Sequence, residues 1–237
     1  MNINQLSEFC YGEIASQYGF IRNQSGYYRV GDRVVTSFAL RKFAGGRMVE
    51  PIMDILPLCG EIHIGSSITM MNQIAADYSR HTEKAGRVWF NSRSSKEECI
   101  AAKECFLDVF HETQKPFLIQ SIDLQSAFDA YCAYLLYQEY RPKEWLESGF
   151  KMLKFNYIAD INYWMFLLAL KQYDKALDNF NEWSKALDKD LLDETHECGK
   201  MQRLLVKEEY DAIETIIKER EQENTELLKK YGVWCQD

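Results

Sequence analysis

One pair of residues in the sequence has the types and spacing that general acid–base catalysis requires. Glu61 and His63 are two residues apart in a short apolar stretch, and alternate residues of a β-strand point to the same face of the sheet. A carboxylate and an imidazole on one face can exchange protons with a substrate. The chain has only four histidines, so Glu61 and His63 are the candidate catalytic residues. A structural histidine at a sheet edge is the alternative interpretation.

Basic residues are concentrated in the segment 20–50, which contains six Lys or Arg residues and two acidic ones. Four of the basic residues fall near expected strand ends: Arg29, Arg33, Arg41 and Lys42. Guanidinium groups bind phosphates and carboxylates through paired, charge-assisted hydrogen bonds. These four residues are therefore candidate ligand- or anion-binding residues. The alternative is a charged sheet face that keeps strand edges from pairing with other chains.

The motif Leu-Asp-x-x-His-Glu occurs at 107–112 and again at 192–197. A carboxylate and a histidine three residues apart on a helix can bind one metal ion when both point into a helix bundle. The apolar residues of the first helix instead leave Asp108 and His111 on its polar side. We therefore expect no metal site and no cofactor. The sequence also lacks the common nucleophile-elbow, phosphate-loop, dinucleotide and zinc-protease motifs.

Composition limits the class of protein. The 237 residues are 46% hydrophobic and 14% aromatic, which is enough to build a core and excludes an intrinsically disordered chain. The formal net charge of −8 makes a nucleic-acid partner unlikely on electrostatic grounds. Seven cysteines without a Cys-x-x-Cys pair predict free thiols and a cytoplasmic location. The longest apolar stretch, 163–170, is too short to cross a membrane, and no signal peptide is expected.

The segment 1–93 predicts an α+β domain built on a small antiparallel β-meander. Apolar residues at helical spacing predict a helix over the first 20 residues, followed by strands near 20–30, 33–43 and 48–58. Two prolines, Pro51 and Pro57, restrict the last of these strands to a sheet edge or interrupt it. Further short strands are expected at 61–64 and 87–90, and a helix at 66–78.

The segment 94–237 predicts an α-helical domain. Overlapping capping-box patterns at 94–98 mark its start. Stripes of apolar residues at positions i, i+3 and i+4 predict helices over 96–113, 123–140, 157–170 and 173–187. A final helix is expected to begin near Val206, with an apolar seam that is interrupted at Arg220 and Asn224.

The segment 163–186 resembles the middle of a tetratricopeptide repeat. Tyr173, Ala176 and Phe180 fall where that family places a turn tyrosine, a small packing residue and an aromatic residue. The resemblance covers about one repeat and lacks the preceding Trp, Leu and Gly positions of the family pattern. Because a single repeat cannot bury its own apolar face, we expect an ordinary antiparallel helix hairpin, with a repeat unit as the alternative.

The first 60 residues also follow an order of short motifs. These are Tyr-Gly-Phe at 18–20, Gly-Tyr-Tyr-Arg at 26–29, Leu-Arg-Lys at 40–42, a Gly pair at 45–46 and Ile-Leu-Pro-Leu-Cys at 55–59. This order resembles an uncharacterised group of bacterial proteins classed only as a domain of unknown function. The resemblance implies a small α+β domain in a bacterial cytosolic protein and assigns no catalytic residue.

Two functions are compatible with these patterns. The absence of a catalytic motif, the acidic helical segment and the supply of aromatic residues favour a non-catalytic protein-interaction module, an adaptor or inhibitor of another protein. The alternative is a small-ligand-binding protein or enzyme that uses Arg29, Arg41 and Lys42 with Glu61 and His63. That alternative predicts one cavity lined by these side chains.

Overall fold

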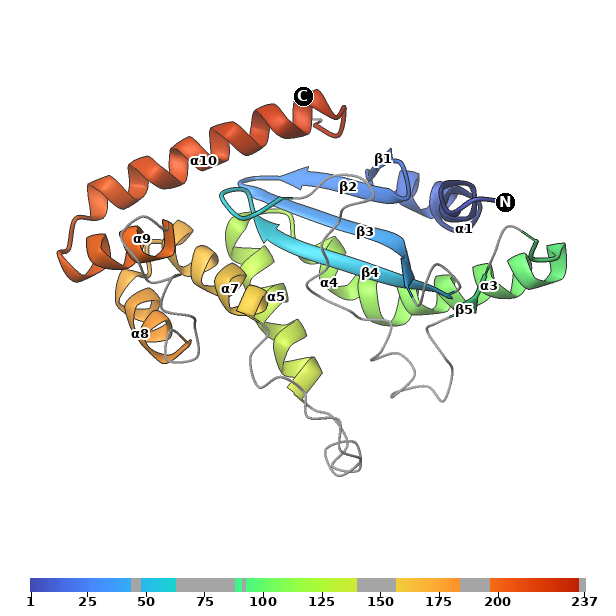
Figure 1. The fold of residues 1–237 in the computed structure, drawn as a ribbon, viewed down its shortest axis with the longest axis horizontal. Helices are drawn as coiled ribbons and strands as arrows, with labels where there is room; N and C mark the ends of the chain where they lie inside the picture. Colours follow the sequence, from blue (N-terminus) through green and yellow to red (C-terminus); the bar gives the residue numbers. More distant parts are fainter. Residues whose placement is uncertain (44–47, 63–87, 91–92, 140–156, 184–196, 235–237) are drawn as a thin grey trace.

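A computed structural model describes residues 1–43, 48–62, 88–90, 93–139, 157–183 and 197–234. Its fold is mixed α+β, as predicted, with a twisted antiparallel sheet followed by a larger helical region (Figure 1). The helix expected at 66–78 and the second half of the strand expected at 61–64, including His63, lie outside the described residues. No helix in the described ranges is long and apolar enough to cross a membrane.

The sheet is a meander in which each strand pairs with the next one in the sequence. Its strands are β1 (Ile21–Asn23), β2 (Gly26–Gly31), β3 (Val34–Phe43), β4 (Met48–Pro57) and β5 (Val88–Trp89). The register places Val34 opposite Pro57 and Arg41 opposite Glu50. Strand β5 pairs only with Met48 and Val49. Beyond Val49, therefore, no described strand lies along the outer edge of β4, and both prolines are accommodated there.

One group of helices packs on the face of the sheet that carries the Phe38 side chain. It comprises α1 (Ile3–Gln17), α3 (Lys96–Val109), a π-helical segment η1 (Phe110–Gln114), α4 (Lys115–Gln120) and α5 (Leu124–Glu139). The capping box predicted at Ser95 and Glu98 is present at the start of α3. The helix predicted to end at residue 113 instead continues through η1 into α4, so that sequence boundary was wrong. A second capping box, formed by Asn2 and Gln5, begins α1.

The remaining helices form two hairpins: α7 (Tyr157–Ala169) with α8 (Tyr173–Trp183), and α9 (Glu197–Val206) with α10 (Tyr210–Lys230). They extend beyond one end of the sheet, and α10 then runs back along the sheet (Figure 1). The predicted final helix is present as α10, but it begins at Tyr210 rather than near Val206, because α9 ends at Val206 and a turn follows. Residue Glu208 in this turn has a φ of 58°, a left-handed conformation that ends a helix.

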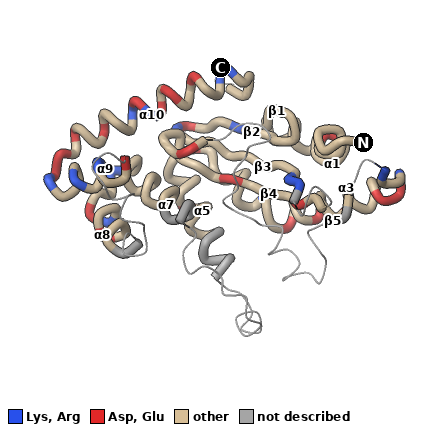
Figure 2. Tube along the Cα trace, in the orientation of Figure 1, with Lys and Arg blue, Asp and Glu red and all other residues tan. Residues whose placement is uncertain are grey.

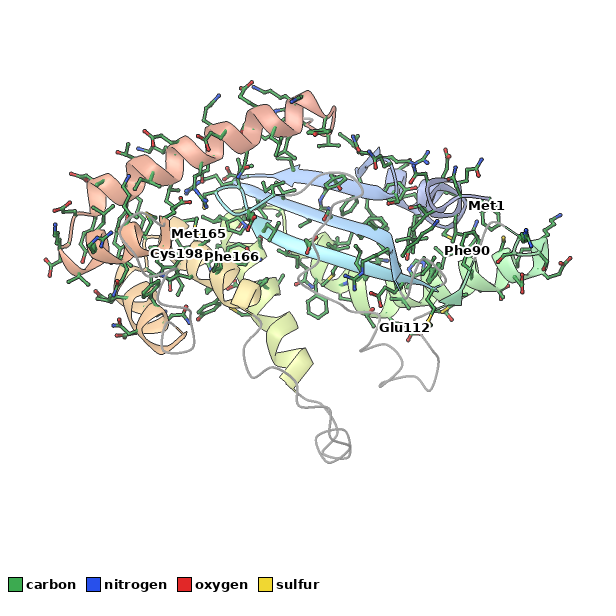
Figure 3. The ribbon with its side chains drawn as sticks, in the orientation of Figure 1. Met1, Phe90, Glu112, Met165, Phe166 and Cys198 are labelled. Atoms are coloured by element: carbon green, nitrogen blue, oxygen red, sulfur yellow. The ribbon has the colours of Figure 1, made fainter. Side chains whose placement is uncertain are left out.

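A single hydrophobic core joins the sheet to the helices. Phe38 of β3 contacts Tyr11 of α1 and Phe110 of η1, with ring centroids 5.2 and 4.9 Å apart. The same core cluster extends to Trp164 of α7 and Ile217 of α10. Figure 3 labels Met165, Phe166 and Cys198 at one end of the molecule and Phe90 at the other, and all four belong to this cluster. The described residues on both sides of the predicted 93/94 domain boundary therefore share one core.

The C-terminal part of α10 covers the opposite face of the sheet. A smaller apolar cluster unites Tyr28, Val35 and Leu56 of the strands with Leu228 and Val233. Here burial of apolar surface removes both partners from water and stabilises the contact.

Polar side chains of α10 hold the loop that follows β4. Asn224 Nδ2 donates hydrogen bonds to the carbonyl oxygens of Leu58 at 2.7 Å and Gly60 at 2.8 Å. Arg220 donates to the carbonyl oxygen of Cys59 at 3.1 Å and pairs with Glu197. Because buried carbonyl groups need partners, the two polar positions that interrupt the apolar seam are the residues that attach α10 to the sheet.

Candidate functional site

Two of the predicted anion-binding residues, Arg29 and Arg41, are engaged by groups of the protein itself. The Arg29 guanidinium donates hydrogen bonds to the carbonyl of Leu118 and, at 3.4 Å, to that of Ser121, so it caps the C-terminal end of α4. It also lies over the ring of Phe20, 5.0 Å from the centroid, and burial lowers its pKa. Arg41 pairs with Glu50, whose side chain is fully buried.

Two of the other predicted residues have exposed side chains. Lys42 is exposed at the end of β3, and Glu61 is exposed after β4. His63 lies outside the described residues, so the proposed Glu61–His63 pair stays a prediction. Arg33 and Arg41 lie at opposite ends of β3, separated by roughly 27 Å of extended strand. The structure therefore does not bring these two residues into one cavity.

Arg33 lies beside a pocket where three distant parts of the chain meet. The pocket has a volume of about 330 Å³ and lies between the β2–β3 turn, the end of α7 and the middle of α10. Its lining residues are Arg33, Leu168, Ala169, Lys171, Glu214, Ile217, Lys218 and Glu221. The four residues from α10 are spaced so that they lie on one face of that helix. This pocket is the candidate ligand site in the described part of the chain.

The turn that carries Arg33 is held in place by the loop between α4 and α5. The backbone N–H of Asp32 donates to the carbonyl oxygen of Ile122 at 2.9 Å. The approach is so close that a Cβ at Gly31 would collide with the same carbonyl group. Arg33 itself has a φ of 58°, which is unfavourable for a residue with a side chain. The backbone therefore holds the Arg33 side chain at the pocket edge.

Ion pairs order the pocket wall. The Nε and Nη2 atoms of Arg33 both lie 2.8 Å from Oε1 of Glu221. Lys171 Nζ lies 2.6 Å from Oε1 of Glu214, which also accepts a hydrogen bond of 3.4 Å from the Tyr173 hydroxyl. The hydrogen bond from Lys171 lowers the pKa of Glu214. Each of the two carboxylates is therefore paired with a cation of the protein.

The two helix hairpins beside the pocket have the same turn. In the first, the backbone N–H groups of residues 170, 171 and 172 donate to the carbonyls of 166, 168 and 167. In the second, residues 207, 208 and 209 donate to 203, 205 and 204, so every number is raised by 37. Lys171 and Glu208 have φ values of 59° and 58° at equivalent positions. This turn is a helix-ending motif, and residues 231–233 form it again at the end of α10. The resemblance of 163–186 to a tetratricopeptide repeat therefore stays a prediction.

The equivalent turn tyrosines stack on each other. The rings of Tyr173 and Tyr210 are parallel within 5°, with centroids 4.3 Å apart. Ala176 and Phe180 of the first hairpin are fully buried, and Ile213 and Ile217 occupy the equivalent buried positions in the second. Adjacent hairpins that share aromatic and apolar contacts are the building unit of helical repeat scaffolds.

The left-handed turn residue provides a stability test. We expect Glu208→Gly to raise the free energy of unfolding by about 0.5–1 kcal/mol, because glycine adopts a positive φ without a steric penalty. Lys171→Gly should give a smaller gain, since it also removes the exposed ion pair with Glu214, worth at most about 1 kcal/mol. Urea denaturation of both variants measures the difference. A loss of stability in Glu208→Gly would contradict the expectation.

Four cysteines in the described ranges are packed as small apolar residues. Cys10, Cys59, Cys99 and Cys198 are buried free thiols. Burial raises the pKa of Cys10 and Cys59 to about 12. Because the thiolate is the nucleophilic form of cysteine, these side chains contribute to packing rather than to reaction. No group of metal-ligating side chains occurs among the residues that the structure describes.

Comparison of the chain with family models, curated proteins and solved structures finds no match. The resemblance of the N-terminal segment to a bacterial domain of unknown function therefore stays a prediction.

Sequence reasoning singled out Arg33 but missed its pocket partners. Glu214, Lys218 and Glu221 belong to a helix whose charges follow an ordinary solvent-facing pattern. Figure 2 shows Lys and Arg alternating with Asp and Glu along α10. Arg33 and Glu221 are 188 residues apart, and no local spacing relates them. A weak signal was available in the shared Tyr-Asp dipeptides at 173–174 and 210–211, which mark the repeated turn.

Proposed function

We propose that the chain is a non-catalytic protein-interaction module, of the adaptor or inhibitor type, whose partner binds the paired hairpins α7–α8 and α9–α10. The observation that carries the proposal is the stacking of Tyr173 on Tyr210, which joins the two hairpins. Stacked helix hairpins bury one face against each other and leave the side chains of the other face available for recognition.

The proposed contact surface is the edge formed by the two hairpin turns. We define this turn edge as the exposed residues Lys171, Asp174, Val206, Glu208 and Asp211. Val206 is an aliphatic residue that is 60% exposed at the end of α9. A central apolar side chain surrounded by charged ones is the usual arrangement of a protein contact.

Two features of the described residues make catalysis a weaker interpretation. The guanidinium groups of Arg29 and Arg41 already donate hydrogen bonds, to the carbonyls of α4 and to buried Glu50 respectively. The pocket carboxylates are also held by ion pairs, with Glu214 kept ionised. A general base needs a pKa near the working pH, and Glu214 has its pKa lowered, away from that range.

The proposal predicts that Val206→Asp abolishes retention of a partner by the immobilised chain. The full chain would be incubated with lysate of its source cells, and bound proteins would be quantified against the amount of chain. We expect one protein at a stoichiometric ratio with the wild-type chain and its loss with Val206→Asp, because a buried, unpaired carboxylate opposes binding.

Ile122→Asp is the matched control. Ile122 is also 60% exposed but lies between α4 and α5, outside the turn edge. This variant should retain the partner, and both variants should unfold at nearly the wild-type urea concentration because the changes are on the surface. Absence of any stoichiometric partner, or an equal effect of the two substitutions, would refute the proposal.

A further inference from the structure

We infer that the pocket between the β2–β3 turn, α7 and α10 binds a small organic carboxylate with a short apolar body. This inference does not rest on the proposed protein partner, although Lys171 belongs to both the turn edge and the pocket. At about 330 Å³, the volume is at the lower end of the range for small-molecule sites. It therefore suits a ligand of a few carbon atoms.

The balance of charges favours an anion. Arg33, Lys171 and Lys218 line the pocket with three positive charges, against two negative charges from Glu214 and Glu221. Each carboxylate is already paired, Glu221 with Arg33 and Glu214 with Lys171. Lys218 is exposed and has no ion pair among the described residues. The positive charge that is left after these two pairs are formed is therefore the ammonium group of Lys218.

Lys171 can join Lys218 in holding the ligand without releasing Glu214. An ammonium group has three N–H donors, and the Lys171 side chain is 59% exposed. The pKa of Glu214 is lowered first by its hydrogen bond from Lys171 and further by the charges of Lys171 and Lys218. Both cations therefore act on the same region, where a second carboxylate would be attracted.

Apolar residues form the wall beside these charges. Leu168 is 1% exposed and Ile217 is 3% exposed, and both line the pocket. An alkyl chain that contacts them would bury apolar surface on binding. The carboxylate would then lie toward Lys171 and Lys218, while the chain lies along Leu168 and Ile217.

The backbone at the pocket supports a role for its charged side chains. Arg33 and Lys171 have φ values of 58° and 59°, where glycine would be favoured. Residues that keep a side chain in such conformations occur frequently at ligand sites, where the surrounding structure holds them. At both positions the sequence retains a cation that faces the pocket.

Isothermal titration of the full chain with hexanoate tests the inference. Hexanamide, the uncharged analogue, and inorganic phosphate, which lacks the apolar body, are the comparison ligands. We expect saturable one-to-one binding of hexanoate and at least about tenfold weaker binding of both comparison ligands. Hexanamide loses a charge-assisted hydrogen bond, and phosphate loses the apolar contact, and either loss is large enough to weaken binding by about that factor.

Two lysine variants locate the site. Lys218→Gln should weaken hexanoate binding by about tenfold, because it removes one charge-assisted contact. Lys200→Gln is the matched control, since Lys200 is an exposed lysine of α9 that does not line the pocket, and its affinity should stay unchanged. Circular dichroism checks that both variants are folded. No saturable binding of hexanoate, equal binding of hexanamide, tighter binding of phosphate, or equal weakening by the two variants would overturn the inference.

Discussion

Replacement of Phe38 by alanine is expected to lower the free energy of unfolding by about 4 kcal/mol, a typical cost for removing a buried aromatic side chain. Phe38 is 1% exposed and is the centre of an aromatic cluster. Its ring centroid lies 5.0 Å from that of Phe20, 5.1 Å from that of Tyr27 and 4.9 Å from that of Phe110. The substitution leaves a cavity between the sheet, α1 and η1, and these rigid elements cannot fully close it.

Phe9→Ala is the matched control for this prediction. Phe9 is 38% exposed on α1, and its ring is 4.8 Å from the ammonium group of Lys103. Its removal should cost about 1 kcal/mol or less. Urea or guanidinium denaturation of the three proteins gives both differences. Similar losses for the two variants would show that Phe38 does not have the central position that the structure gives it.

Replacement of Arg41 by methionine should lower the free energy of unfolding by about 3 kcal/mol, because it removes the guanidinium that pairs with the buried Glu50 carboxylate. Arg41 and Glu50 are directly opposite on β3 and β4. Arg41 donates from both Nε and Nη2 to the same carboxylate oxygen. The Glu50 side chain is fully buried, whereas that of Arg41 is 27% exposed.

A second substitution separates the effect of losing the Arg41–Glu50 ion pair from the effect of losing packing. The double variant Arg41→Met/Glu50→Leu should recover most of the stability, since two apolar residues can replace a buried ion pair at little cost. Lys229→Met, which breaks an exposed pair with Glu226, should change the unfolding free energy by less than about 1 kcal/mol. A double variant no more stable than Arg41→Met would contradict the charge explanation.

The sheet and the helix starts could be predicted from the sequence because their signals are local. The alternation of side chains along 33–43 predicted β3, and the spacing of Ser95 and Glu98 predicted the start of α3. Gly19 follows Tyr18, the C-cap of α1, and has a φ of 71°, which glycine adopts without a steric penalty. Such signals lie within a few residues of the element that they define.

Other features could not be predicted because their signals are absent or distant. The turns at Lys171 and Glu208 use left-handed residues that are not glycine, so the break before α10 was missed. The roles of Arg220 and Asn224 depend on the carbonyls of residues 58–60, more than 150 positions earlier. The second hairpin was not predicted from the sequence, because Ile213 lies at the position equivalent to the small residue Ala176 and so departs from the pattern of the first hairpin.

The arrangement of α10 has a consequence for the order of folding. Asn23 Nδ2 in the first hairpin of the sheet donates to the carbonyl of Tyr231, 208 residues later, at 2.9 Å. Tyr28, Val35 and Leu56 are shielded by Leu228 and Val233, so a nascent chain shorter than about 230 residues exposes them to water. Contacts between such distant residues form slowly, and exposed sheet surface promotes aggregation. During synthesis, this face of the sheet therefore needs protection until α10 emerges from the ribosome.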